Sequence, residues 1–266
     1  MRGIATFGVS IVLVAGAACS SFSEASDGAG DGGSVSPDAG LGSDGSVVPD
    51  APGDAPAGSC TTLLDEGFAT QRGEWRTTGQ NQAFEPNQLV LTPGAGSKNG
   101  AAWWGAPLTY EGRLRVRVDF RIAQPPSDPG DGFAIAWIDA NDPLPTTIGG
   151  QGQSFELCGL APAVHGYAVT GSTKYDEVAI IDTVNCNAAT PSDRPMAQLD
   201  GTHTFKFDIR PSAITGSLDD TTPLSRTKLD PPAPKRGYFG LSAASSGTAA
   251  TAHVITRVVI ESCPDF

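Results

Sequence analysis

The sequence around one aspartate, Asp131, suits its carboxylate to hydrogen bonding with a ligand. Asp131 lies in a Gly-Asp-Gly turn directly ahead of the apolar run 133–138. Such a run predicts a buried strand, so the carboxylate is expected at the rim of a dry core. There it would accept charge-assisted hydrogen bonds from a ligand. The alternative is a turn residue that caps the entry to the strand.

Two short groups of oxygen-bearing side chains are candidate cation ligands. Asp139, Asn141 and Asp142 form the first group, and Asp176 with Glu177 forms the second. Carboxylate and amide oxygens are ligands that Ca²⁺ takes in proteins. The same side chains can equally face solvent. Calcium is therefore one of two alternatives, and no other cofactor is expected.

The N-terminus has the pattern of an export signal. Arg2 precedes an apolar run over 4–18 that is too short to span a bilayer as a mature helix. The run ends at Gly-Ala-Ala-Cys19, which resembles a bacterial lipobox, where small residues precede a lipidated cysteine. We expect 1–18 to be a lipoprotein signal peptide and Cys19 to anchor the exported protein in the cell envelope, at the outer membrane. The alternative is an ordinary secretory signal.

The segment 19–59 has the composition of a flexible linker. Gly, Ser, Ala, Pro and Asp dominate it, and it contains seven acidic residues and no Lys or Arg. Such a segment cannot bury enough apolar surface to offset its chain entropy, so disorder is expected. Its reach of roughly 30–40 Å would hold a domain away from a membrane surface. The membrane is then a partner through the lipid alone.

The remaining segment, 60–266, has the length of one all-β domain. Removing seven acidic residues and Arg2 from the totals of 29 and 17 leaves 22 acidic and 16 basic residues, a net charge of −6. An acidic surface argues against nucleic acid as a partner.

Alternating stretches predict strands throughout this domain. In the clearest, 113–122, apolar residues alternate with Arg and Asp for ten positions. Turn residues at intervals of roughly ten favour an antiparallel sandwich or jelly roll. The other predicted strands are 88–92, 130–138, 166–169, 178–182, 203–210, 214–218, 237–247 and 253–262.

The polar face of the strand at 113–122 carries Arg113, Arg115 and Arg117. We interpret these arginines as solvent-exposed and paired with acidic residues on a neighbouring strand. A binding site for polyanions is the alternative.

Four cysteines remain after Cys19, namely Cys60, Cys158, Cys186 and Cys263. An even number in an exported domain predicts two disulfides, with three possible pairings. A zinc site is the alternative, but no Cys-x-x-Cys spacing exists and the three histidines are scattered.

Two segments of the domain resemble the signature strands of legume-type, concanavalin A-like lectins. The first begins Asp131-Gly-Phe-Ala-Ile, and the second is Gly237-Tyr-Phe-Gly-Leu-Ser-Ala. The resemblance covers most of 60–263 and implies an all-β fold, an antiparallel β-sandwich of the concanavalin A-like jelly-roll type. It also implies that the first and last strands lie side by side. Cys60 would then pair with Cys263, which leaves Cys158 with Cys186.

The resemblance implies a sugar site as well. In the family, the aspartate and a glycine of a Gly-Gly loop bind sugar hydroxyls, and these positions correspond to Asp131 and to Gly149 or Gly150. Tyr167, or alternatively Trp103 or Trp104, would stack on the sugar ring. The implied partner is a glycan or a cell-surface polysaccharide.

The sequence departs from the family at the metal site. Legume-type lectins carry two carboxylate ligands on the strand after the Gly-Gly loop, whereas this chain has Thr170 and Ser172. The paired metal site of the family is therefore expected to be lost.

An enzyme is the second class of function, and the sequence argues against it. The Glu-x-Asp-x-x-Glu signature of related glycoside hydrolases does not occur, and the spacing of Glu177 and Asp182 places them on opposite faces of a strand. No Gly-x-Ser-x-Gly motif exists either. We therefore expect a non-catalytic, carbohydrate-binding module. The alternatives are a protein-interaction module without a sugar site and, less favoured, a glycoside hydrolase.

Overall fold

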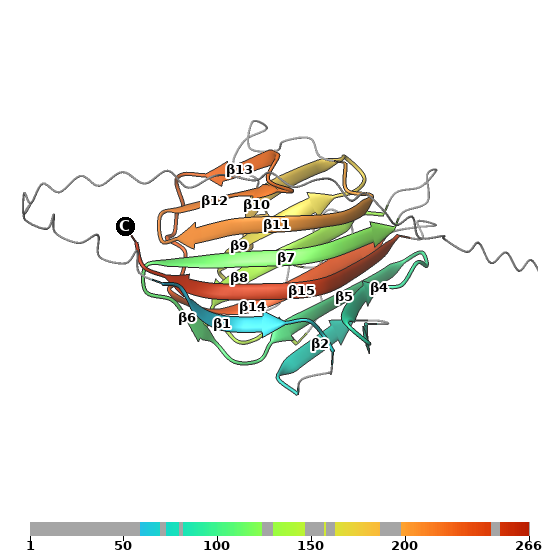
Figure 1. Ribbon diagram of the computed structural model, residues 1–266, viewed down its shortest axis with the longest axis horizontal. Coiled ribbons are helices and arrows are strands. Elements are labelled where there is room, and N and C mark those ends of the chain that lie inside the picture. Colours follow the sequence, from blue (N-terminus) through green and yellow to red (C-terminus); the bar gives the residue numbers. More distant parts are fainter. Residues whose placement is uncertain are drawn as a thin grey trace, which may run out of the picture. The chain divides into compact units, whose positions relative to one another are not determined.

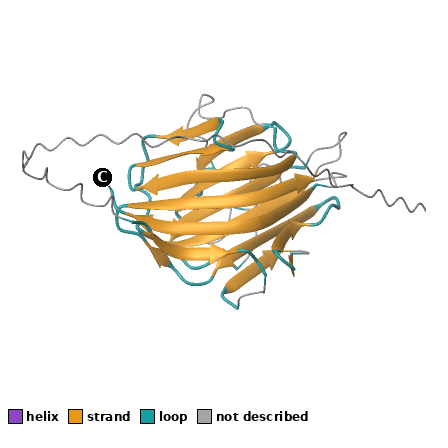
Figure 2. Ribbon diagram, in the orientation of Figure 1, coloured by secondary structure: helices purple, strands orange, loops and turns teal. Residues whose placement is uncertain are grey.

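The described part of the chain is built from β-strands. The structure is a computed structural model that describes residues 59–69, 73–79, 82–123, 130–146, 157, 163–186, 198–245 and 251–265. All of them belong to the second of two units into which the chain divides, Gly53–Phe266. Strands, loops and turns account for them, and no helix occurs among them (Figure 2). This part of the chain accordingly holds no helix with the length and apolar character of a membrane span.

Antiparallel strands form two sheets. The first is eight-stranded, with neighbours in the order β13 (Thr222–Arg226), β12 (Ala213–Leu218), β11 (Gly201–Arg210), β7 (Arg113–Ala123), β15 (Ala252–Cys263), β4 (Gln88–Thr92) and β3 (Ala83–Glu85), while β1 (Thr61–Glu66) pairs with β15. The second is seven-stranded, in the order β10 (Glu177–Asp182), β9 (Gly166–Ser172), β8 (Gly132–Asp139), β14 (Arg236–Ser245), β5 (Lys98–Trp104) and β2 (Trp75–Gly79), while β6 (Leu108–Thr109) pairs with β14.

The two sheets pack face to face around one apolar core. Figure 1 shows β11, β7 and β15 side by side in the nearer sheet, with β8, β9 and β10 behind them. The apolar positions of β7 are buried and the positions between them are not, as the alternation of its sequence predicts. Phe120 on β7 meets Phe133 on β8 with 4.5 Å between ring centroids, which joins the sheets through aromatic contact. The predicted antiparallel sandwich is confirmed.

The seven-stranded sheet is buried on its second face too. Small side chains cover that face, among them Ala134 and Ala136 of β8 and Ala168 of β9. Leu157 and Val164 pack on them in a second apolar cluster. Strands that are buried on both faces carry continuous apolar sequence, which explains the unbroken run of β8.

The arginines of β7 pair with acidic residues, as interpreted from the sequence, and Arg115 and Arg117 face solvent. Arg113 is only 19% exposed, and Arg117 pairs within its own strand instead of with a neighbouring one. Arg115 lies opposite Asp208 of β11, with Nε 3.4 Å from the carboxylate. Arg113 also reaches Asp208 at 3.4 Å, and the Nε of Arg117 lies 3.0 Å from Asp119.

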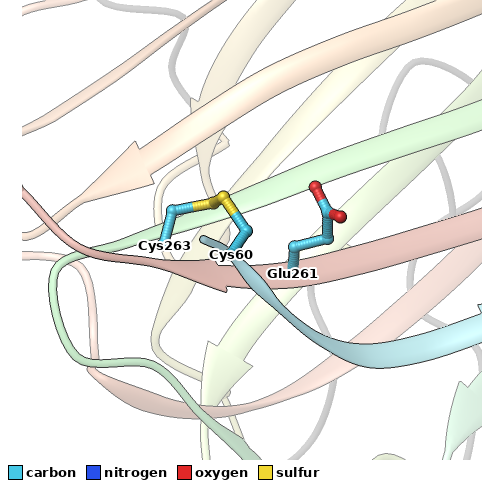
Figure 3. Close-up of side chains that lie close together, drawn as sticks. All are labelled: Cys60, Glu261 and Cys263. Carbon is cyan, nitrogen blue, oxygen red and sulfur yellow. A yellow bond between two sulfur atoms is a disulfide. The ribbon is translucent and has the colours of Figure 1, made fainter. Parts of the chain in front are cut away.

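A disulfide links the two ends of the domain. Cys60 precedes β1 and Cys263 ends β15; their sulfur atoms are bonded, and their Cα atoms lie 4.2 Å apart (Figure 3). Thr61 pairs with Ser262 in the sheet, so the first and last strands are neighbours. The expected Cys60–Cys263 pair is confirmed. Cys186 is disulfide-bonded as well, while its expected partner Cys158 lies outside the described residues.

Candidate functional site

Asp131 lies at the mouth of the central strand β8 and is buried, with 4 % of its surface exposed. Gly130, the residue before Asp131, is hydrogen-bonded at both its amide and its carbonyl. The Gly130 amide donates a 2.7 Å hydrogen bond to the hydroxyl of Thr251, and the hydroxyl of Thr173 donates a 2.5 Å bond to the Gly130 carbonyl. Thr251 precedes β15 and Thr173 follows β9, so three separate parts of the chain position Asp131.

The two glycines around Asp131 have distinct structural reasons. A Cβ atom on Gly130 would lie 2.6 Å from the Thr251 hydroxyl oxygen, inside van der Waals contact. Gly132 has φ of 135°, a conformation that side chains other than hydrogen rarely adopt. Gly130 therefore allows Thr251 to lie close to the backbone before Asp131, and Gly132 allows the positive φ of the turn after it.

A buried polar network supports the Thr251 anchor. Thr92 donates a 3.1 Å hydrogen bond to the Thr251 carbonyl, and its hydroxyl oxygen lies 2.7 Å from Nδ1 of His253. A hydroxyl has one hydrogen, so with that hydrogen on the carbonyl, Nδ1–H of His253 donates to Thr92. Burial lowers the pKa of His253 to about 3, because a charged imidazolium would lose its hydration there. The anchor is therefore held by a neutral histidine at ordinary pH.

The aromatic residues expected to stack on a sugar are not available for that role. Tyr167 is only 2 % exposed, its hydroxyl donates to the Pro231 carbonyl at 2.5 Å, and the Arg226 guanidinium lies 5.2 Å from its ring centroid. Burial also raises the pKa of Tyr167. Trp103 and Trp104 are buried too.

The position of Tyr167 also separates it from Asp131. Tyr167 pairs with Trp137, which lies six residues along β8 from Asp131, a distance of about 20 Å. The expectation for Tyr167 is therefore corrected. Its side chain lies on the face of β9 that packs in the core between the sheets, near the end of β8 that is far from Asp131.

Tyr175 is an aromatic residue at the Asp131 end that sequence reasoning missed. It is 43 % exposed and belongs to the turn between β9 and β10, two residues after the Thr173 that binds Gly130. The Lys174 ammonium lies 5.6 Å from its ring centroid. An aromatic residue in the polar turn Thr-Lys-Tyr-Asp, between two predicted strands, was the signal that would have identified it.

The two groups of candidate calcium ligands lie at opposite ends of the seven-stranded sheet. Asp139 accepts a 2.8 Å hydrogen bond from the Asn141 amide, and Asp142 accepts one of 2.6 Å from the His165 amide, so both carboxylates hold a loop at the end of β8. Asp176 and Glu177 lie at the turn between β9 and β10, at the opposite end of the sheet.

Only one group of three potential metal ligands occurs within the described ranges. Cys60, Glu261 and Cys263 form it, and Figure 3 shows the two sulfur atoms bonded to each other beside the Glu261 carboxylate. Disulfide sulfurs are not thiolates, so this group does not offer a metal site.

The side chains at the family's metal-ligand positions do not suit a divalent cation. Thr170 donates a 3.3 Å hydrogen bond to the Ala179 carbonyl. The Ser172 hydroxyl is buried and has no hydrogen-bond partner within the described residues. Two neutral hydroxyls replace two carboxylates, which removes the charge that holds Ca²⁺. Gly149 and Gly150 lie outside the described residues, so their place relative to Asp131 stays a prediction.

The pair of carboxylates on β10 does not form a hydrolytic site. Asp182 lies 3.9 Å from the Arg226 guanidinium, and both side chains are nearly buried. Glu177, at the other end of β10, is paired with Ser172 of β9. Two carboxylates at opposite ends of one strand cannot act together on one glycosidic bond.

Comparison with known proteins places the fold. No family model matches the sequence, and no curated protein matches it. Solved structures do match. The carbohydrate recognition domain of Emp47p is 11% identical; the match covers 79% of this chain and 100% of that one, with a TM-score of 0.60. Basic winged bean lectin with Tn-antigen is 15% identical, with coverages of 76% and 98% and a TM-score of 0.62, and peanut lectin with a nine-residue peptide is 16% identical, with coverages of 76% and 97% and a TM-score of 0.59. The chain therefore has the concanavalin A-like fold of L-type lectins.

Proposed function

We propose that this protein is a non-catalytic carbohydrate-binding module, exported and anchored by lipid on Cys19 in the bacterial cell envelope. The observation that carries the proposal is the position of Asp131 at the mouth of β8, directly after Gly130, whose backbone is hydrogen-bonded by Thr173 and Thr251. The matched solved structures include a carbohydrate recognition domain and a lectin with bound Tn-antigen, which supports a glycan as the ligand.

Asp131 supplies the polar half of the proposed site. A carboxylate in a low-dielectric setting accepts stronger hydrogen bonds than it would in water, so a sugar hydroxyl that reaches the Asp131 carboxylate would bind it strongly. Gly149 and Gly150 would add backbone amide donors. Thr170 and Ser172 do not provide the charge that calcium requires, so the proposed contacts do not depend on a metal at the positions that the family uses.

Tyr175 supplies the apolar half. Its exposed ring stands on the turn that Thr173 ties to Gly130, so ring and carboxylate belong to one end of the sheet. An exposed aromatic ring stacks on the apolar face of a pyranose with little loss of side-chain entropy. Affinity for a single sugar would be weak, and dense display on a cell surface would raise it by avidity.

A glycan array tests the proposal with two matched substitutions on one strand. Asp131→Asn keeps the shape but removes the charge, and Asp139→Asn makes the same change at the opposite end of β8. Hydrogen bonds to charged groups contribute roughly 1.5–3 kcal/mol, so Asp131→Asn should weaken binding about ten- to hundredfold. Asp139→Asn should bind like the wild type. Equal weakening by both variants would place the sugar elsewhere.

A protein-interaction module is the second candidate. It is favoured by the loss of the two carboxylates at Thr170 and Ser172, and by the matched peanut lectin structure, which contains a peptide. Wild-type protein that binds no sugar on a broad array, and that binds members of a random peptide library through Tyr175, would support this candidate instead.

A further inference from the structure

A small pocket lies at the end of the sandwich that is far from Asp131. Its volume is about 250 Å³, and Asp139 is one of the residues that line it. Asp139 lies at the last position of β8, eight residues from Asp131, a distance of about 26 Å. The other side chains that line the pocket are those of His165, Tyr167, Pro231, Pro232 and Pro234.

The proline wall of the pocket is held by two buried aromatic side chains. The Tyr167 hydroxyl donates a 2.5 Å hydrogen bond to the Pro231 carbonyl. The indole Nε1 of Trp137 donates one of 2.7 Å to the Pro234 carbonyl. Proline rings also fix the backbone φ, so this wall has little freedom to lose when a ligand binds.

Asp139 supplies a carboxylate that can accept further hydrogen bonds. Its Oδ1 accepts a 2.8 Å bond from the Asn141 amide, and its side chain makes no other hydrogen bond or ion pair in the part of the chain that the structure describes. The two oxygens of a carboxylate offer about four acceptor sites. Asp139 is also partly exposed, so a donor that enters the pocket can reach it.

The pocket is acidic in either protonation state of its histidine. Asp139 contributes a charge of −1. Nδ1 of His165 lies 3.1 Å from the Asp142 carboxylate, so this pair contributes 0 with a charged imidazole and −1 with a neutral one. The sum is therefore −1 + 0 = −1 or −1 − 1 = −2.

The arginine beside Tyr167 does not neutralise the pocket. The Arg226 guanidinium lies 5.2 Å from the centroid of the Tyr167 ring and 3.9 Å from the carboxylate of Asp182. Both members of this ion pair are nearly buried, and neither lines the pocket. The charge of Arg226 is therefore balanced by Asp182.

Two further cations follow the prolines along the chain, and both are directed elsewhere. The Lys235 ammonium donates a 3.2 Å hydrogen bond to the Glu111 carbonyl. Arg236 precedes Gly237, which pairs with Asp139 across β14 and β8. Successive residues of a strand point to opposite faces, so the Arg236 side chain lies on the other face of the sheet from Asp139.

The walls select an ammonium group on an aliphatic stem. The proline rings and the Tyr167 ring give methylene groups an apolar surface, while Asp139 accepts hydrogen bonds from the charged end. A guanidinium fork needs both carboxylate oxygens and would compete with the Asn141 amide, whereas an ammonium needs one oxygen. A volume of about 250 Å³ lies below the usual range for drug-sized ligands and suits one group of side-chain size.

We propose that this pocket binds an aliphatic ammonium group, with its charged end on Asp139 and its methylene stem against the proline rings and Tyr167. A lysine side chain of a partner protein and a free alkylamine share this chemistry. The pocket is a second ligand site, separate from the proposed carbohydrate site, and does not use Asp131.

Titration calorimetry on the full chain tests the pocket. The charged probes are n-pentylamine and Nα-acetyl-lysine methylamide; n-pentanol and Nα-acetyl-norleucine methylamide are their uncharged counterparts. Asp139→Asn removes the charge but keeps an oxygen that can accept from the Asn141 amide. Asp176→Asn removes one charge from the exposed turn between β9 and β10, and asparagine tolerates the φ of 50° there.

The two variants should differ in how they bind the amines. An exposed ion pair corresponds to up to about fivefold in affinity, so Asp139→Asn should bind both charged probes about fivefold more weakly. Asp176→Asn should bind them like the wild type. Affinity of the wild type should also rise from methylamine to n-pentylamine, by up to about fourfold for each methylene that the walls bury. Circular dichroism confirms that each variant is folded.

Further arms separate the possible outcomes. Asp131→Asn should leave amine binding unchanged, and Asp139→Asn should leave binding of neutral glycans unchanged, so this proposal and the proposed function fail independently. Equal losses in Asp139→Asn and Asp176→Asn, no binding of either amine by the wild type, or equally tight binding of the uncharged probes would overturn the proposal. Tighter binding of the lysine derivative than of n-pentylamine would support a protein side chain as the ligand, and the reverse order would support a free amine.

Discussion

Acid should destabilise this domain through one buried histidine. His253 is fully buried, and its pKa is lowered from 6.5 to about 3. Between these values the unfolded state binds a proton at His253 and the folded state does not. The free energy of unfolding therefore falls as the pH drops below 6.5, by about 1.4 kcal/mol for each pH unit. Between pH 7 and pH 4.5 the loss from this residue amounts to about 2.5 kcal/mol.

His253→Asn isolates the effect. Asparagine places a polar atom near the position of Nδ1, where it can still bond to Thr92, but it does not titrate. The variant starts less stable at pH 7, and the difference from the wild type should shrink by about 2.5 kcal/mol at pH 4.5.

Urea unfolding from pH 7 to pH 4.5, followed by tryptophan fluorescence, measures these differences. Parallel pH dependences for the wild type and His253→Asn would refute the reasoning, because they would mean that His253 takes up its proton equally in both states. Crystals of the variant that still show Asp131 in place would confirm that the network tolerates the change.

Two predictions concern the covalent features of the chain. Cys19→Ser should abolish incorporation of labelled fatty acid and release the protein from the membrane fraction; unchanged fractionation and mass would contradict the proposed anchor. Replacing both Cys60 and Cys263 by Ser should lower the free energy of unfolding by up to about 5 kcal/mol, because the disulfide closes a loop with a sequence separation of 203. Denaturation of the variant measures this, and a loss below about 1 kcal/mol would show that the unfolded chain gains little freedom.

Strands are predicted best from the sequence where one face of the strand is exposed to solvent. β7 alternates because its Arg and Asp side chains face solvent while its apolar ones enter the core, and the predicted strand 113–122 matches Arg113–Ala123. β5 was missed for the opposite reason. Trp104 packs between the sheets and Trp103 on the second apolar cluster, so both faces are buried and Ala and Gly fill the positions ahead of them. β8 is also buried on both faces but could be predicted, because its larger apolar residues form an unbroken run that the small residues of β5 do not.

The candidate site was predicted unevenly. Asp131 could be identified because a single carboxylate interrupts an apolar context, and it lies where the pattern places it. Tyr167 could not be judged, because the sequence alone does not tell which end of a buried strand faces a ligand or which sheet face is the core. Tyr175 was overlooked since a turn residue belongs to no periodic pattern, and only the Thr173–Gly130 hydrogen bond reveals that its turn lies next to Asp131.

The disulfide at Cys60 decides how this domain would respond to pulling. A tensile load on the chain ahead of Cys60 does not have to pass into β1 first, because the bond to Cys263 carries it directly to the end of β15. β15 is hydrogen-bonded to β7, β4 and β1, so it cannot be peeled away one bond at a time like a free edge. Many hydrogen bonds would have to shear together. A protein held at its N-terminus in flowing medium would thereby keep its sandwich intact under forces that would unzip an unlinked first strand.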